Sequence, residues 1–172
     1  MKLAFENIVL KSSTIKELNE LDNIYKEACD YFKFDINHEI IHPKICIEEG
    51  DLPPNGSKDK FEILSCYINE ILSGYITVYK GYHDDTTIYI CFIYLVDLVK
   101  GQGVGNKIIN YLCKVFKKDG FSNIKLSVSL KNWDGLKFWN KCGFDKISLI
   151  DCEGHFSKNN YGCIELTKDI QY

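Results

Sequence analysis

The sequence predicts an α/β (α+β) fold, in which a mixed, mostly antiparallel sheet of about six to seven strands is flanked by helices. Three observations lead to this prediction. Two strand-like runs, 61–68 and 74–79, are joined by a short loop at 69–73, as in an antiparallel hairpin. A long apolar run, Ile88 to Val96, leads into a glycine-rich turn and then a segment of helical periodicity. Residues 124–130 alternate apolar and polar side chains, as a half-buried strand does.

Length and composition indicate one globular domain spanning residues 1–172. A chain of 172 residues can bury one substantial core, and its 45% hydrophobic and 26% charged content is typical of globular proteins. The net charge of −3 argues against a nucleic-acid partner, because such proteins usually present a basic face. No run approaches the ~18 apolar residues of a membrane span. Glu6 and Asn7 interrupt any apolar core of a signal peptide.

The cysteines indicate a reducing compartment. Eight of them are scattered along the chain, with no C-x-x-C pair and no clustering with the four histidines. This pattern favours free thiols, a cytoplasmic location and no metal site.

The first third of the chain predicts a strand at 3–10 and then a helix. Thr14 is the expected N-cap, and Glu17 completes a capping box. The apolar stripe that follows predicts an amphipathic helix ending near Lys33. Between 35 and 60, closely spaced turn signals predict a long irregular segment.

The rest of the chain predicts alternating strands and helices. The turn at 83–85 leads into the central strand, and the helix after the glycine turn ends at Asp119-Gly120. A short helix should begin at Asn132 and end at Gly143. Two final strands are expected at 144–150 and 161–170, joined by a polar loop at 157–160.

The glycine-rich turn between the central strand and the helix is the strongest functional signal. Its residues are Lys100-Gly101-Gln102-Gly103-Val104-Gly105-Asn106-Lys107. Glycines allow close approach of a ligand to the backbone, and free amides at a helix N-terminus favour phosphate. Two alternatives remain: a turn shaped only by packing, and a dinucleotide-binding turn. The second requires a third glycine at position 106, where this chain has Asn.

Two motifs in this order resemble the GNAT N-acetyltransferase superfamily. Gly103 and Gly105 match the acyl-CoA pyrophosphate loop, Gln/Arg-x-x-Gly-x-Gly/Ala, with Lys100 in place of Gln or Arg. The resemblance covers residues 61–150 best. The second motif resembles Asn-x-x-Ala-x-x-Phe-Tyr-x-x-x-Gly-Phe and comprises Asn132, Gly135, Phe138, Trp139, Gly143 and Phe144.

The resemblance implies that acetyl-CoA lies between the central strand and the 124–130 strand, which splay apart. Backbone groups at Leu95 and Val96 would bind the pantetheine arm, and one N–H would stabilise the oxyanion. Lys107 would approach a phosphate, and Asn132 would bind pantetheine or simply cap its helix. The implied cofactor-binding set is Leu95, Val96, Lys100, Gly101, Gln102, Gly103, Val104, Gly105, Asn106, Lys107, Asn132, Phe138 and Trp139.

The chain departs from the family in its acid and its base. Trp139 stands where many members have Tyr, and an indole cannot supply a proton at neutral pH. We expect Trp139 to form a wall of the channel, and Tyr94 or Tyr161 to be the alternative acid. The central strand contains no acidic residue to act as the base. Nearby candidates for the base are Glu62, His83, Asp84 and Asp97.

The predicted function is acetyl-CoA-dependent transfer of an acetyl group to a primary amine by direct attack, in a monomer or homodimer. The acceptor would be a small amine or a peptide N-terminus. Glu48, Glu49 and Asp51 in the irregular segment are candidates to receive its ammonium group, and a solvated surface loop is the competing interpretation. The alternative function is a non-catalytic acyl-CoA-binding module, which the missing acid and base would suit.

Overall fold

The computed structural model describes residues 2–37, 39–155, 157 and 159–171. Among them a single eight-stranded sheet has the order β1-β2-β3-β4-β5-β6-β8-β7. All neighbouring strands are antiparallel except β5 and β6, which are parallel. The strands are β1 (Lys2–Phe5), β2 (Ile8–Ser12), β3 (Phe61–Ile68), β4 (Ile71–Lys80), β5 (Thr87–Leu95), β6 (Asn123–Ser129), β7 (Lys146–Cys152) and β8 (Gly162–Asp169).

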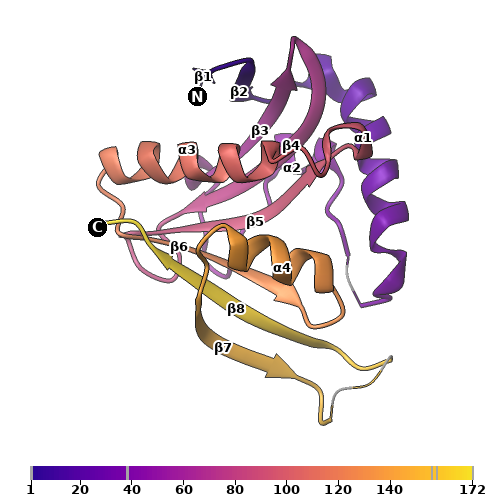
Figure 1. Cartoon of the computed structure of the whole chain (residues 1–172), viewed down its shortest axis with the longest axis vertical. Coiled ribbons are helices and arrows are strands. Elements are labelled where there is room, and N and C mark those ends of the chain that lie inside the picture. The colour runs from indigo at the N-terminus through magenta and orange to yellow at the C-terminus, as the bar shows by residue number, and fades with distance from the viewer. Residues whose placement is uncertain (1, 38, 156, 158, 172) are drawn as a thin grey trace.

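Helices cover both faces of this sheet (Figure 1). On one face α3 and α4 pack against the sheet residues Ile88 and Leu126, and on the other α1 and α2 pack against Tyr75. We call these the α3–α4 face and the α1–α2 face. None of the helices in the described part of the chain is long and apolar enough to cross a membrane. The helices are α1 (Leu18–Tyr31), α2 (Pro43–Glu48), α3 (Val104–Lys118) and α4 (Trp133–Lys141), with 3-10 turns η1 (Ile15–Glu17), η2 (Phe32–Phe34), η3 (Lys58–Lys60) and η4 (Asp97–Val99).

The predicted mixed, mostly antiparallel sheet is confirmed, with one strand more than expected. The predicted strand at 3–10 is instead a hairpin of β1 and β2, because the chain reverses at Glu6-Asn7. Glu6 has a φ of 48°, the left-handed conformation of a tight turn. β7 and β8 correspond to the two predicted C-terminal strands, and Lys158 in the predicted loop between them lies outside the described residues.

The N-terminal helical segment begins as predicted, and the irregular segment contains a short helix. The Thr14 amide donates to Glu17 Oε2 at 2.9 Å, so the capping box is present, although its first turn is the 3-10 turn η1. Within 35–60, Pro43 starts the six-residue helix α2, and the Lys44 amide donates to His42 Nδ1 at 3.2 Å. Six residues are too few to show helical periodicity, so the pattern alone did not predict α2.

The feature that positions the site is an early end to the β5–β6 pairing. The ladder joins only Thr87–Tyr89 to Asn123–Lys125, although both strands continue beyond it. A β-bulge at Cys91 interrupts the β4–β5 register, with Val78 opposite Ile90 and Thr77 opposite Phe92. Because a bulge bends its strand, β5 turns away from β6 above this point. The predicted splay between the two strands is therefore present.

Gly74 on β4 holds the far end of β5 in place. A Cβ at Gly74 would lie 2.3 Å from the Tyr94 carbonyl oxygen and 2.6 Å from Leu95 Cδ2. Gly74→Ala should therefore push the two strands apart and lower the free energy of unfolding by about 1–3 kcal/mol. Urea denaturation followed by circular dichroism measures this loss. An unchanged midpoint would show that β4 and β5 separate there without cost.

Candidate active site

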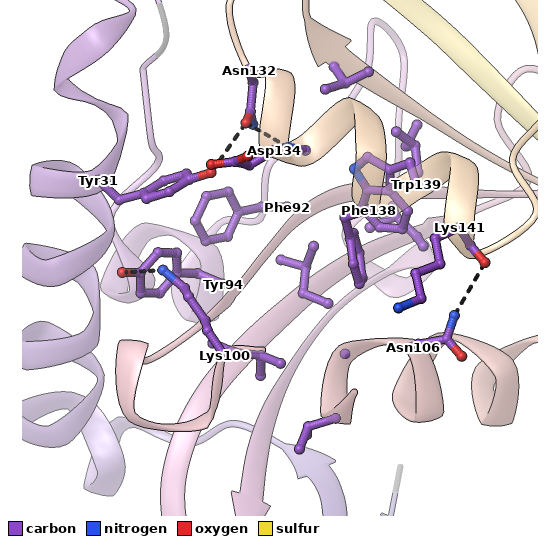
Figure 2. Close-up of a pocket in the computed structure, with 18 of the residues that line it drawn as sticks. Tyr31, Phe92, Tyr94, Lys100, Asn106, Asn132, Asp134, Phe138, Trp139 and Lys141 are labelled. Atoms are coloured by element: carbon purple, nitrogen blue, oxygen red, sulfur yellow. Dashed lines mark hydrogen bonds between the residues drawn. The ribbon is translucent and has the colours of Figure 1, made fainter. Parts of the chain in front are cut away.

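A cavity of about 510 Å³ fills the space between the separated ends of β5 and β6. Its two walls are residues 90–95 of β5 and 126–129 of β6, and its remaining lining comes from the glycine turn, from α4 and from the end of α1. In Figure 2, Phe138 and Trp139 lie on one side and Tyr31, Phe92 and Tyr94 on the other. The cavity thus opens between the two helical layers.

The backbone of β5 offers hydrogen-bonding groups to this cavity. The Val96 amide donates to the Ser73 carbonyl at 2.9 Å, so at Val96 the backbone faces β4. Successive peptide groups of a strand point to opposite sides, so those of Leu95 and Ile93 face the space that β6 has left. Of the two predicted backbone contacts, Leu95 is available, whereas the Val96 amide is already used. Ile93 was not among the predicted residues, because a sequence does not show which way a peptide points.

The glycine turn presents amides at the N-terminus of α3. Gly101 and Gly103 have φ values of 74° and 77°, which a residue with a Cβ rarely adopts. The first helical bond runs from the Lys107 amide to the Gly103 carbonyl at 3.1 Å. The amides of Val104, Gly105 and Asn106 therefore precede the hydrogen-bonded ladder of α3. Together with the positive end of the helix dipole, they form a suitable anion-binding surface.

Gly105 serves a different purpose, which is close packing of α3 against α4. A Cβ at Gly105 would lie 2.9 Å from Phe138 Cε2 and 3.6 Å from Leu95 Cδ1. Any larger residue would push Phe138 into the cavity or move α3. The second glycine of the motif thus preserves the width of the cavity mouth.

The charged side chains of the turn lie in different places. Lys100 lines the cavity, and its Nζ donates to Tyr94 Oη at 3.0 Å and to Asp97 Oδ1 at 2.6 Å. The Lys107 ammonium instead pairs with Glu6 Oε2 at 2.7 Å, and its side chain does not line the cavity. The Gln102 amide likewise turns away, donating to the Leu98 carbonyl at 2.8 Å.

α4 supplies the opposite wall. Asn132 caps α4, because its Oδ1 accepts the Gly135 amide at 2.8 Å, and it also accepts the Tyr31 hydroxyl at 3.2 Å. The helix-capping interpretation of Asn132 is therefore realised, and both bonds are drawn in Figure 2. Trp139 is 6% exposed and packs edge-on against Phe144, with ring centroids 5.1 Å apart. It lines the cavity, as expected of a wall residue.

Tyr94 is buried on the α1–α2 face in a polar cluster. Its hydroxyl donates to Glu27 Oε1 at 3.2 Å and accepts from Lys100. Burial and the negative charges of Glu27 and Asp97 hold the pKa of Tyr94 well above its usual range. Tyr94 is therefore a weak proton donor. The other predicted phenol, Tyr161, contacts Cys163 Sγ at 2.8 Å and lies outside the cavity lining.

Polar bonds tie the end of α1 to the end of β6 across the cavity. Besides the Tyr31–Asn132 bond, Asp35 accepts from Ser129 Oγ and from Lys131 Nζ, the latter at 2.9 Å. The Asp35 and Lys131 side chains are only 6% and 9% exposed. Burial alone would raise the pKa of Asp35, but these bonds outweigh it and lower the pKa. This cross-link keeps the separated walls at a defined spacing.

Comparison with known proteins agrees with this geometry. A family model described as acetyltransferase (GNAT) family matches residues 21–144, well over half of the chain. The chain belongs to the GNAT acetyltransferase family. Its GNAT domain is 29% identical over 101 residues to N-alpha-acetyltransferase 50 of Danio rerio. That match covers 58% of this chain and 56% of the relative, so the chain spans about half the length of the curated relative it matches.

Solved structures with very different sequences share the GNAT fold. An acetyltransferase of Salmonella typhimurium that modifies the N-terminal serine of a ribosomal protein has a TM-score of 0.73 at 8% identity, covering 96% of both chains. Spermidine N-acetyltransferase of Vibrio cholerae, solved with CoA and spermine, has a TM-score of 0.68 at 13% identity, covering 95% of both chains. At such identities the likeness concerns the fold alone.

The acidic residues predicted to receive an acceptor lie outside the cavity lining of the GNAT domain. Glu48 and Glu49 are exposed at the end of α2. Asp51 is half-buried, and burial raises its pKa. The cavity itself is lined by one carboxylate, Asp134, and by two lysines. Glu48, Glu49 and Asp51 are not in this lining, so their role in binding an acceptor stays a prediction.

The cross-link generates a prediction about pH. Asp35 has a lowered pKa in the folded chain, so it contributes stability above its unfolded pKa of about 3.9, and this contribution is lost as pH falls through the folded value. Asp35→Asn should lower stability at pH 7 and flatten its decline on the acid side. Thermal melts from pH 3 to pH 7 measure both effects, with the exposed Asp30→Asn as the control. Parallel curves for wild type and Asp35→Asn would contradict the assignment.

The α3 amides generate a prediction about anion binding. Gly103→Glu should weaken CoA affinity at least ~10-fold more than Gly103→Gln. The introduced carboxylate would repel a diphosphate bound at the N-terminus of α3, whereas the neutral amide of Gln would not. Both variants carry the same backbone strain at a φ of 77°, so their difference isolates the charge. Calorimetric titration with CoA measures it. Equal affinities of the two variants would exclude a phosphate at this turn.

Proposed function

We propose that this GNAT domain is an acetyl-CoA-dependent N-acetyltransferase that moves an acetyl group to a primary amine by direct attack. The observation that carries the proposal is the pair of free β5 peptides beside the amide-rich start of α3. The first fits an extended pantetheine arm, which would lie along β5 as an added strand. The second fits the diphosphate at the other end of the same molecule.

The residues present would perform three tasks in this reaction. Acetyl-CoA supplies the activated acyl group. The amide of Leu95 or Ile93 would donate to the thioester oxygen and stabilise the oxyanion that develops during attack. The narrow cavity would hold amine and thioester together. This lowers the barrier, because the two reactants lose their translational entropy on binding and not in the chemical step. The thiol of CoA has an ordinary pKa of about 8.5, so the thiolate can leave without a strong protein acid.

The charge of the cavity lining supports an acceptor with one cationic nitrogen. With one carboxylate and two lysines, the described lining cannot neutralise several ammonium groups at once. The aromatic residues Tyr31, Phe32 and Phe92 form its apolar part on the α1–α2 side. We therefore favour a peptide N-terminus or a small monoamine over a polyamine as the acceptor.

The test combines CoA binding with turnover. Calorimetry should detect CoA binding, and thiol release from acetyl-CoA should depend on an amine drawn from peptides with free N-termini, monoamines and spermidine. Saturable binding without turnover across the panel would favour the non-catalytic acyl-CoA-binding module instead. Absence of CoA binding would overturn both functions.

We also infer a cytoplasmic location from the state of the thiols. All eight cysteines are free, and seven of them are buried or lie within the sheet. Burial raises the pKa of Cys91 to about 12, so this thiol in the cavity wall stays protonated and is not an acyl carrier. Detection of a stable disulfide in the purified native protein would contradict a reducing location.

Trp139 tests the acid side of the mechanism. Trp139→Phe should lower turnover by less than ~10-fold, because we assign Trp139 packing and no proton transfer, and a general acid contributes about 10²–10⁴-fold. Steady-state kinetics with calorimetric CoA affinity measure the effect. The exposed Trp133→Phe on the same helix is the control. A collapse of kcat with CoA affinity intact would show that the indole has a chemical role.

A further inference from the structure

His83 and Glu165 form a hydrogen-bonded pair outside the predicted cofactor site. His83 Nε2 lies 2.7 Å from Glu165 Oε2, and the Glu165 side chain is only 6% exposed. The other oxygen of Glu165 accepts from Lys125 Nζ at 2.9 Å and from Ser148 Oγ at 2.6 Å. These bonds outweigh burial and lower the pKa of Glu165, so the carboxylate stays ionised at neutral pH.

The pair lies where β5 and β6 begin to separate. Tyr89 and Lys125 are the last residues paired in the β5–β6 ladder, and the next residues of each strand line the cavity. The His83 ring is 6.1 Å from the Tyr89 ring, and Lys125 bonds to the same Glu165. His83 and Glu165 are not part of the cavity lining, and the pair lies beside the last paired residues of the β5–β6 ladder.

The pair lies on the α1–α2 face, which in our proposed function is the side of the acceptor. Glu165 is directly opposite Ser127 across the β6–β8 ladder, and Ser127 lines the cavity. Ile124, Leu126 and Val128 of β6 pack in the core of the α3–α4 face, so the alternating Lys125 and Ser127 point to the α1–α2 face. The His83 side chain is 46% exposed there, so water reaches it.

We propose that His83 is the general base of the acetyl transfer and that Glu165 is its positioning residue, a proposal that rests on the proposed function. A carboxylate accepting from Nε2–H fixes the tautomer, so the lone pair lies on Nδ1. The ammonium N–H bond of the acceptor breaks and its proton goes to Nδ1, directly or through one water. After that proton has passed to solvent, the amine attacks the thioester carbon. The C–S bond then breaks, the new amide nitrogen gives its second proton to Nδ1, and solvent protonates the thiolate. His83 returns its proton to solvent.

The neighbouring groups fit this assignment. In the described part of the chain, the charged and titratable groups around the imidazole are Glu165 of β8, Lys125 of β6, Tyr89 of β5 and the adjacent Tyr82 and Asp84. The Asp84 carboxylate accepts from the Thr86 and Thr87 hydroxyls. Burial, followed by the charge of Glu165, holds the pKa of Tyr89 well above its usual range, so this phenol is not a base at neutral pH. An imidazole is the side chain whose ordinary pKa of about 6.5 suits proton abstraction there.

The test compares three variants of the full chain with the wild type. His83→Gln should lower kcat about 10²–10⁴-fold and abolish the acidic limb of the pH–rate profile, with CoA affinity within twofold of wild type. Glu165→Gln should lower kcat less, with CoA affinity unchanged, because the imidazole stays but loses the carboxylate that fixes its tautomer. His42→Gln is the matched control, since His42 Nε2 also lies near a carboxylate, 3.3 Å from Asp22 Oδ1, and should leave the profile unchanged.

The outcomes separate this proposal from the proposed function. A wild type without turnover on any amine would overturn the proposed function and the base with it. An active wild type whose acidic limb persists in His83→Gln, at similar kcat, would overturn only the base. His83 is half-exposed in a loop, so circular dichroism should show that His83→Gln folds as the wild type does. If Glu165→Gln does not fold, the kinetics of His83→Gln alone decide whether His83 is the base.

Discussion

The early end of the parallel β5–β6 ladder is the constraint on which the rest of the structure depends. Two strands that run side by side would normally satisfy each other's backbone groups, yet here pairing stops after Tyr89 and Lys125. The chain keeps the walls apart by a bulge at Cys91 below and by the buried Asp35–Lys131 pair above. A buried ion pair adds little stability over an apolar replacement, although losing one partner is costly, and we infer that this pair sets the spacing of the walls. The unpaired peptides of β5 leave free hydrogen-bonding groups along the cavity.

The sheet separates two kinds of chemistry. On the α3–α4 face lie backbone amides and the Gly105–Phe138 contact, which suit a long anionic cofactor. The α1–α2 face instead carries aromatic rings and the ionised Glu165, which suit an amine and the removal of its proton. The cavity in the gap between β5 and β6 is lined by residues of both faces. A thioester placed in that gap would meet its nucleophile from the opposite side.

The departures of this chain from the family pattern have local structural reasons. Trp139 stands where many family members have Tyr. Its indole packs against Phe144 and forms the cavity wall at that position. Lys100 replaces Gln or Arg and folds back over the Tyr31 and Tyr94 rings, with its Nζ 4.4 Å and 4.1 Å from their centroids. Its charge is thereby shared with the polar cluster around Glu27. The amides of the turn at the start of α3 remain free of intrahelical partners.

Several features followed from the sequence because their causes are local. The capping box at Thr14, the glycine turn before α3 and the Asn132 cap each depend on residues within a few positions of one another. The resemblance of the two motifs to the GNAT family also indicated the splay. Turn chemistry of this kind is readable because backbone conformation there depends on single residues.

The tertiary structure alone decided the orientation of the β5 peptides, the role of Lys107 and the partners of His83. Lys107 pairs with a residue 101 positions away, and His83 with one 82 positions away. A one-residue change of register would turn every β5 peptide to the opposite side, and nothing in the local pattern sets that register. The local amino-acid sequence therefore determined which helices and strands form and where a phosphate could bind. Packing between distant strands determined which groups meet at the cavity. Long-range contacts depend on how all strands assemble together, which is why they could not be derived from neighbouring residues.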